Sequence, residues 1–149
     1  MAGSDRLNAD EQLQIKAAIA EAEKSTSGEI RLFIEDDCKE NVLDRAAFIF
    51  NELGMHKTKE RNGVLIYLAM DSHHFAIIGD GGINSKVKKD FWHDIKLEMQ
   101  HHFTAGDFVT GLKNGIEMTG DALKEYFPYH KSDKNELSDE IVFGKKKNP

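Results

Sequence analysis

Residues 61–82 read RNGVLIYLAMDSHHFAIIGDGG, and this stretch decides the fold of the chain. Residues 64–70 are an apolar run of strand length, residues 71–73 are a polar break, and residues 75–78 are a second apolar run that ends in Gly-Asp-Gly-Gly. This pattern predicts a β-hairpin. Because both runs are apolar at successive positions, we expect both strands to be buried on two faces, at the centre of a sheet rather than at its edge.

The segments around the hairpin carry helix and strand patterns. Their periodicity predicts a strand over residues 29–34 and helices over residues 8–24, 41–53, 85–102 and 108–126. The strand–helix–strand connection makes strands 29–34 and 64–70 parallel, because such crossovers are right-handed. The sequence therefore predicts an α/β fold, a three-layer α/β/α sandwich on a small mixed sheet of about four strands.

Two glycines interrupt the last predicted helix, Gly111 and Gly115. Each costs about 1 kcal/mol relative to alanine in a helix. We therefore expect this helix to pass close to another helix or to the sheet at these positions.

The length of the chain limits the number of domains. A chain of 149 residues is long enough for one well-buried domain and too short for two ordinary ones. We expect residues 1–129 to form a single domain. Residues 130–149, rich in Lys, Asp, Asn and Ser, are expected to form a disordered tail. Within this tail, the apolar segment 141–143 before three lysines could dock a partner, and an unstructured end is the alternative.

Composition excludes several classes of protein. The net charge of −6 disfavours nucleic acid and anionic membranes as partners, because both bind basic surfaces. The single cysteine, Cys38, cannot form an intramolecular disulfide. The N-terminus has no apolar signal region, and no window approaches the roughly 18 apolar residues of a membrane span. We expect a cytoplasmic protein without a membrane span.

Topology brings several polar residues to one edge of the predicted sheet. The starts of strands 29–34 and 64–70 and the end of strand 75–78 share this edge. The residues expected there are Glu29, Arg61, Asn62 and Asp80, and Asp107 at the start of the last helix is expected to join them. Carboxylate, amide and carbonyl oxygens are the ligands of Ca²⁺ and Mg²⁺. We therefore predict a divalent-metal site, for Ca²⁺ or Mg²⁺, with Asp80, Glu29, Asn62 and Asp107 as ligands.

Three of the four predicted ligands also have a simpler interpretation. Asp107 could be the N-cap of the last helix, Glu29 could form a salt bridge with Arg61, and Asp80 could be a turn residue. Carboxylates brought together without a cation would repel and raise the pKa of one another, which favours the metal site.

A second acidic group lies at the opposite edge of the predicted sheet, formed by Glu35, Asp36, Asp37 and Asp71. Its spacing is not that of an EF-hand. We interpret it as a solvated face, with a weaker second metal position as the alternative.

The other motifs are weaker. The histidine pairs His73-His74 and His101-His102 do not have the i, i+4 spacing of helical zinc ligands, and we interpret most histidines as surface residues. The Gly-x-Gly at residues 79–81 lacks the third glycine of a dinucleotide-binding fingerprint. No serine or threonine has an identifiable base that would make it a nucleophile.

The order of several motifs resembles the TPM domain family, which includes thylakoid-lumen phosphatase-like proteins linked to photosystem II repair. The resemblance covers roughly residues 8–128, and its most specific parts are Arg-Asn-Gly-Val-Leu at 61–65 and Phe-x-x-Gly-Asp-Phe-x-x-Gly-Leu at 103–112. It implies an α/β/α sandwich, calcium or similar metal binding in some members, and an acid-phosphatase-like activity in the plant branch. It implies no catalytic residue. Here Asp80 precedes Gly81-Gly82-Ile83, whereas the family motif often reads Gly-x-Gly-Leu-Glu, so the loop that supplies a metal ligand differs.

Two functions follow from these observations. The first is a stand-alone TPM-like domain that binds a divalent metal, with calcium expected, and acts as a metal-responsive binding or regulatory module for an unknown protein partner. The second is a metal-dependent, acid-phosphatase-like phosphomonoester hydrolase. We favour the first, because Arg61 is the only cationic side chain expected in the site to hold a phosphate.

Overall fold

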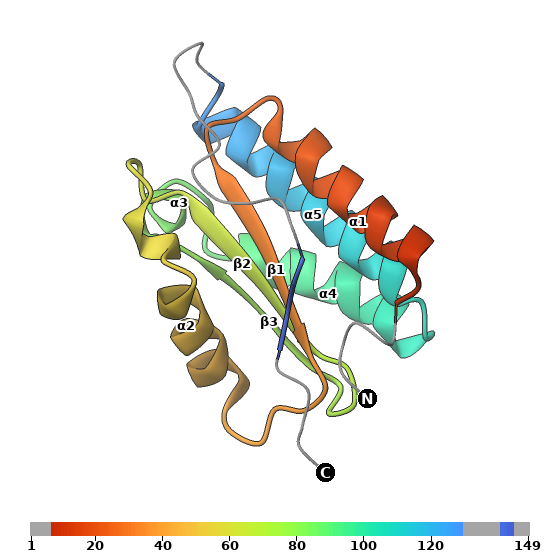
Figure 1. Cartoon of the computed structure of the whole chain (residues 1–149). Coiled ribbons are helices and arrows are strands. Elements are labelled where there is room, and N and C mark those ends of the chain that lie inside the picture. Colours follow the sequence, from red (N-terminus) through yellow and green to blue (C-terminus); the bar gives the residue numbers. More distant parts are fainter. Residues whose placement is uncertain (1–6, 130–140, 145–149) are drawn as a thin grey trace.

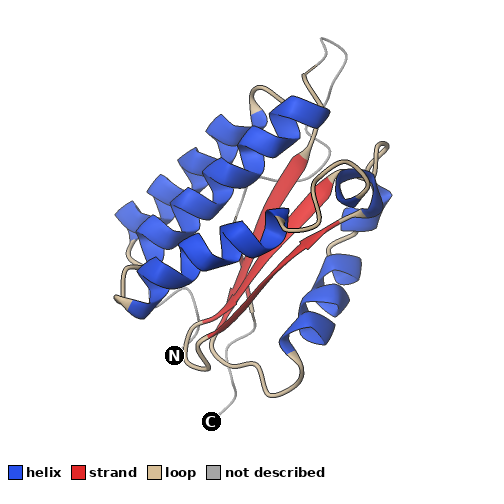
Figure 2. Ribbon diagram, turned by 180° about the vertical axis from the view of Figure 1, so that it is seen from behind, coloured by secondary structure: helices blue, strands red, loops and turns tan. Residues whose placement is uncertain are grey.

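The computed structural model describes residues 7–129 and 141–144. Its elements are α1 (Ala9–Glu23), β1 (Glu29–Glu35), α2 (Val42–Glu52), the 3₁₀ helix η2 (Met55–Lys57), β2 (Gly63–Ala69), β3 (His74–Gly79), α3 (Gly81–Asn84), α4 (Phe91–Thr104), α5 (Phe108–Tyr126) and β4 (Val142–Phe143). Helices α1, α4 and α5 cover one face of the sheet and α2 covers the other (Figures 1 and 2). The predicted α/β/α sandwich is confirmed.

The sheet has the strand order β3-β2-β1-β4. Strands β1 and β2 are parallel, as predicted, and β2 and β3 form the predicted antiparallel hairpin. All seven residues of β2 are buried, which confirms its central position. The expectation that β3 is also central is wrong, because β3 pairs only with β2 among the described strands. Its apolar run has another cause, since α2 and α4 contact it from opposite faces.

Side chains that alternate along the strands form two cores. Ile30, Leu32 and Ile34 of β1 pack with the helices α1, α4 and α5, whereas Phe33 and Tyr67 pack with α2. Each large apolar side chain that is fully buried stabilises the fold by about 1.5–3 kcal/mol. The two cores fix the register of β1 and β2, and with it the positions of the residues at the strand ends.

The expected close approach at Gly111 and Gly115 is confirmed. A Cβ atom at Gly111 would lie 2.5 Å from the Phe103 ring, and one at Gly115 would lie 2.5 Å from Met99 Sδ. Both contacts are with α4, so the two glycines allow α5 to pack closely against it.

The predicted helix 85–102 begins too early. The structure has the short helix α3 immediately after Asp80, and α4 starts only at Phe91. The segment between them carries Lys86, Lys88 and Lys89. Positive charges are unfavourable at a helix N-terminus, which favours a start after these lysines.

Part of the predicted tail belongs to the sheet. Val142 and Phe143 pair in parallel with Phe33 and Ile34 of β1, so the expectation of an unstructured end does not hold for these two residues. Residues 130–140 and 145–149 lie outside the described residues. Within the described part of the chain, no helix combines the length and the apolar composition needed to cross a membrane.

Candidate functional site at the amino-terminal edge of the parallel strands

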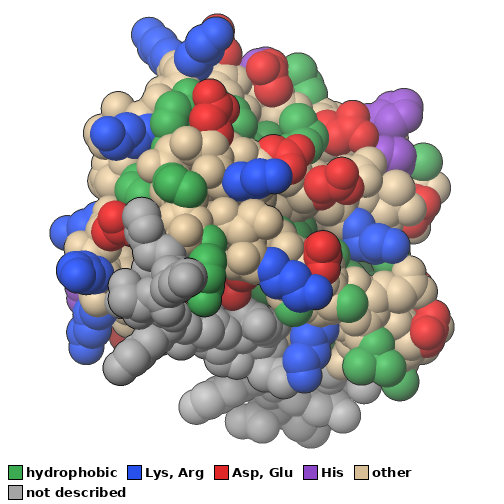
Figure 3. All heavy atoms as spheres, turned by 90° about the horizontal axis from the view of Figure 1, so that it is seen from above, with side chains coloured by type: hydrophobic (Ala, Val, Ile, Leu, Met, Phe, Trp, Pro, Cys, Tyr) green, Lys and Arg blue, Asp and Glu red, His purple; other side chains and the backbone are tan. Residues whose placement is uncertain are grey.

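Buried polar residues gather where β1 and β2 begin and β3 ends. Seven polar or charged side chains of the described residues are buried, and five of them lie at this edge: Thr26, Glu29, Thr58, Asn62 and Asp80. Seen from this end, the surface of the molecule carries both acidic and basic side chains (Figure 3). Burial of polar groups is costly unless they are paired, so this concentration marks the edge as the candidate site.

Backbone hydrogen bonds hold three of the predicted ligands on neighbouring strands. The Glu29 N–H donates to the carbonyl of Asn62 at 3.3 Å, and the Asp80 N–H donates to the carbonyl of Gly63 at 2.9 Å. The backbone of Asn62 and Gly63 therefore lies between the backbones of Glu29 and Asp80. The topological prediction that these residues share one edge is confirmed.

Asp80 forms the central ion pair of the site. Arg61 donates to it twice, from Nε to Oδ2 at 2.6 Å and from Nη2 to Oδ1 at 2.7 Å. Asp80 is also the N-cap of α3, where it accepts from the Gly81 N–H at 2.8 Å. Burial opposes ionisation of Asp80, but the hydrogen bonds from Arg61 and Gly81 outweigh it and hold the pKa of Asp80 below its usual value. The carboxylate is thus kept charged inside the protein.

The loop that carries Arg61 is held in an unusual conformation. Arg61 has a φ of 54°, in the left-handed region that residues other than glycine rarely adopt. Thr58 fixes the loop, because its carbonyl accepts from the Arg61 N–H and its hydroxyl accepts from the Asn62 N–H, both at 3.2 Å. Helix α3 rests directly on this loop, since a Cβ atom at Gly82 would lie 2.1 Å from the Glu60 carbonyl oxygen.

Asn62 is 1% exposed, and only one end of its amide is paired. Its Nδ2 donates to Ser27 Oγ at 3.3 Å and to Glu60 Oε2 at 3.4 Å. Its Oδ1 is buried and accepts no hydrogen bond from any described residue. A buried amide oxygen without a donor is costly, and it is also a suitable ligand for a hard cation.

The expectation that Asp107 joins this site is wrong. Asp107 is the N-cap of α5, where its Oδ1 accepts from the Thr110 N–H at 3.1 Å. The other end of α5 meets the site, because the Thr26 hydroxyl donates to the carbonyls of Leu123 and Phe127. The helix between Asp107 and Leu123 spans about 24 Å at a rise of 1.5 Å per residue, which places Asp107 far from Asp80.

The residues of the second acidic group have different hydrogen-bond partners. Glu35 accepts from Arg45 Nε and Nη2, both at 2.9 Å, and from the hydroxyl of Tyr67. Asp36 and Asp71 are linked through their backbones at 2.7 Å, and the Ser72 hydroxyl donates to Asp37 at 3.4 Å. Among the residues that the structure describes, no three His, Cys, Asp or Glu side chains lie close enough together to hold a metal ion.

The sequence interpretation missed some residues of the site. Ser27 Oγ donates to Glu60 Oε2 at 2.6 Å, and both contact the Asn62 amide. The position of Ser27 gives a partial signal, since Ser27 precedes Glu29 by two residues, the spacing at which side chains of an extended chain share a face. Glu60 gives no such signal, because the left-handed backbone of Arg61 lies between Glu60 and Asn62.

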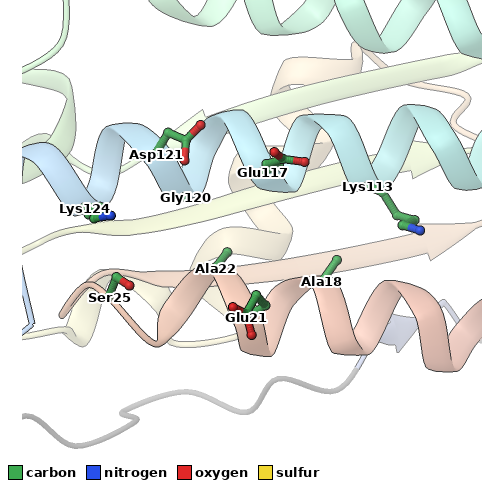
Figure 4. Close-up of a pocket in the computed structure, with 9 residues that line it drawn as sticks. All are labelled: Ala18, Glu21, Ala22, Ser25, Lys113, Glu117, Gly120, Asp121 and Lys124. Atoms are coloured by element: carbon green, nitrogen blue, oxygen red, sulfur yellow. The ribbon is translucent and has the colours of Figure 1, made fainter.

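A surface groove lies elsewhere, between α1 and α5 (Figure 4). It encloses about 420 Å³ and is lined by Ala18, Glu21, Ala22, Ser25, Lys113, Glu117, Gly120, Asp121 and Lys124. Both acidic and basic side chains line it, and none of the predicted ligands does. We therefore keep the strand edge as the candidate site.

Comparison with known proteins identifies the family. The TPM domain matches residues 3–122 of the chain. The solution structure of the BA42 protein from the psychrophilic bacterium Bizionia argentinensis is similar, with 46% sequence identity, a TM-score of 0.86, and coverage of 91% of this chain and 94% of that one. The N-terminal domain of cg2496 from Corynebacterium glutamicum shares the fold, with a TM-score of 0.64, 11% identity, and coverage of 98% and 86%. None of the curated proteins matches. This chain belongs to the TPM domain family.

Proposed function

We propose that this TPM domain binds a divalent cation, Ca²⁺ in preference to Mg²⁺, at the amino-terminal edge of the parallel strands and acts as a metal-responsive binding or regulatory module. One observation carries the proposal: the buried Oδ1 of Asn62 has no hydrogen-bond donor among the described residues, at the same strand edge as the buried residues Glu29 and Asp80. The protein partner and the cytoplasmic location stay predictions from the sequence.

The chemistry of the available donors fits a hard cation. Glu29 and Asp80 supply carboxylate oxygens, and Asn62 supplies an amide oxygen. Ca²⁺ takes about 6–8 oxygen ligands in flexible geometry, so water and loop carbonyls would complete its shell. Mg²⁺ demands a stricter octahedral arrangement and gives up water reluctantly, which favours Ca²⁺ at a site with few protein ligands.

The Arg61–Asp80 ion pair would couple cation binding to a change in the surface of the protein. Arg61 occupies both carboxylate oxygens of Asp80, so a cation that binds Asp80 competes with the guanidinium for them. The Arg61 side chain is already 55% exposed and can turn toward solvent when it is displaced. Its left-handed backbone and the contact of its loop with α3 would then relax, which changes the surface around residues 58–62 and 80–84.

Calorimetric titration of Ca²⁺ into the full chain tests the proposal. Asp80→Asn and Asp107→Asn form a matched pair, because each removes one negative charge from an N-cap and asparagine caps a helix as well as aspartate does. We expect Asp80→Asn to weaken binding by about tenfold or more, equivalent to about 1.4 kcal/mol, and Asp107→Asn to leave it within about twofold. Arg61→Gln should tighten binding, because it removes the competitor. Equal effects of the two aspartate variants, or no binding to the unmodified chain, would contradict the proposal.

The exposed Arg61 guanidinium beside Asp80 favours the phosphatase as a second candidate. In this function the displaced guanidinium would stay near the bound cation and hold a phosphate group through two parallel hydrogen bonds. This function predicts turnover of para-nitrophenyl phosphate that requires the metal and is lost in Arg61→Gln. Turnover that persists after chelation and in Asp80→Asn would exclude hydrolysis at this site.

A further inference from the structure

A second cluster of metal-ligating groups lies between α4 and α5, remote from the Asp80 site. Glu98 and His102 are on α4 and Asn114 is on α5, and the two helices pack side by side (Figure 1). Three atoms form a triangle: Glu98 Oε1 lies 3.1 Å from His102 Nε2, Asn114 Nδ2 lies 3.0 Å from Glu98 Oε1, and Asn114 Nδ2 lies 3.2 Å from His102 Nε2. Glu98 and His102 are four residues apart, so both side chains project from the same face of the helix.

Protons cannot satisfy all three contacts of this triangle. When the Asn114 amide nitrogen points inward, it needs an unprotonated His102 Nε2 as acceptor, whereas Glu98 needs a protonated Nε2 as donor. A half-turn of the amide places its oxygen beside a protonated Nε2, but this oxygen then faces the Glu98 carboxylate. Every arrangement therefore leaves one of the three contacts unfavourable.

A metal ion would make all three contacts favourable. With its amide turned, Asn114 contributes Oδ1, Glu98 contributes a carboxylate oxygen, and unprotonated His102 contributes Nε2. Metal–ligand bonds of about 2.0–2.2 Å place neighbouring ligand atoms of a tetrahedral site about 3.3–3.6 Å apart, so the three atoms would have to separate by only a few tenths of an ångström. The side chains of His102 and Glu98 are 25% and 41% exposed, so solvent can reach the site and fill the remaining coordination positions.

We propose that Glu98, His102 and Asn114 form a binding site for a borderline transition-metal ion such as Zn²⁺. The imidazole ligand distinguishes this site from one for Ca²⁺, which takes oxygen ligands, and suits Zn²⁺, Cu²⁺ or Ni²⁺. The pair Glu98 and His102 has the i, i+4 spacing that the adjacent histidines His101 and His102 lack. An amide is a weaker ligand than a carboxylate or an imidazole, so we expect modest affinity.

Calorimetric titration of Zn²⁺ into the full chain, with Ca²⁺ in excess, tests this site. His101→Gln is the matched control for His102→Gln, because His101 is its exposed neighbour on the same helix and lies outside the triangle. We expect one zinc per chain, a loss of affinity of about tenfold or more in His102→Gln, and a change within about twofold in His101→Gln. Circular dichroism of each variant verifies that it folds.

Asn114→Asp provides a test in the opposite direction. The substitution replaces the weak amide ligand by a carboxylate, beside the Glu98 carboxylate and the His102 imidazole, and should tighten zinc binding by about tenfold. Without metal, the new carboxylate faces Glu98, so the melting temperature should fall and then rise with zinc by more than in the unmodified chain. The proposal is overturned if the unmodified chain binds no stoichiometric zinc, if both histidine variants lose affinity equally, or if Asn114→Asp does not bind zinc more tightly.

Discussion

The contact between α3 and the Arg61 loop gives the sharpest prediction for the fold around the site. Gly81 and Gly82 are adjacent residues of the same short helix, but a Cβ atom at Gly81 meets no atom within 4 Å, whereas one at Gly82 lies 2.1 Å from the Glu60 carbonyl oxygen and 2.5 Å from that of Arg61. Both obstacles are backbone atoms, which cannot turn aside as a side chain would. Gly82→Ala must therefore push α3 away from the loop.

The magnitude follows from the size of this overlap. Real Cβ atoms do not approach other heavy atoms within 3.0 Å, so the two segments must separate by almost an ångström. Overpacking of this kind costs about 1–3 kcal/mol, and we expect the upper end because α3 also holds Asp80 at its N-cap. Gly81→Ala should change stability by no more than about 0.5 kcal/mol, as an exposed substitution without new contacts.

Urea denaturation of the two variants and the unmodified chain measures the difference. A loss of about 3 kcal/mol corresponds to a fall in melting temperature of roughly 6–12 °C for a domain of this size. The Gly82→Ala chain should also bind Ca²⁺ more weakly, because Asp80 moves with α3. If the two alanine variants have the same stability, α3 does not rest on the Arg61 loop and this description of the site is wrong.

Three further predictions concern buried polar groups, one at the site and two elsewhere in the fold. Asp80 has a lowered pKa in the folded chain, so its ion pair stabilises the fold fully at pH values above the ordinary aspartate pKa. This stabilisation is lost as the pH falls through the lower pKa of the folded state. In urea titrations from pH 6 downward, the difference in stability between the unmodified chain and Asp80→Asn should therefore shrink. Tyr67→Phe should cost about 1.5–3 kcal/mol, because it removes a buried hydroxyl that donates to Glu35, whereas Tyr129→Phe, on an exposed residue, should cost nothing measurable by thermal melting. Thr119→Val should stabilise the fold by about 1 kcal/mol, since the fully buried Thr119 hydroxyl has no partner among the described residues; a lower melting temperature would contradict this assignment.

The sequence predicts the centre of the fold well, because its signals there are local. The apolar runs of residues 64–70 and 75–78 and the crossover rule are enough to place β1, β2 and β3 in their correct directions. The edge position of β3 is not visible in its composition, since helices on both faces make it as apolar as a central strand. Strand β4 is only two residues long, and it lies more than a hundred residues after β1 in the sequence, with which it pairs. So short a strand has no periodicity from which it could be predicted.

The candidate site divides in the same way. Glu29, Asn62 and Asp80 follow from strand direction alone, and the structure brings them to one edge. The position of Asp107 depends on the direction in which α5 runs relative to the sheet, and helix periodicity does not reveal this direction. The simpler interpretation paired Arg61 with Glu29, whereas the structure shows an ion pair between Arg61 and Asp80 that the sequence does not predict. The left-handed backbone at Arg61, which helps to orient its side chain, is not visible in the sequence either.

The location of bound Ca²⁺ tests the central claim most directly. We propose to follow the backbone amide resonances of the ¹⁵N-labelled chain by NMR during a Ca²⁺ titration. Saturable shifts should appear at residues 28–30, 61–63 and 79–84, where the Glu29, Asn62 and Asp80 segments are joined by hydrogen bonds. Shifts confined to residues 36–38 and 70–73 would move the cation to the second acidic group, and no saturable shift would contradict the metal-responsive function itself.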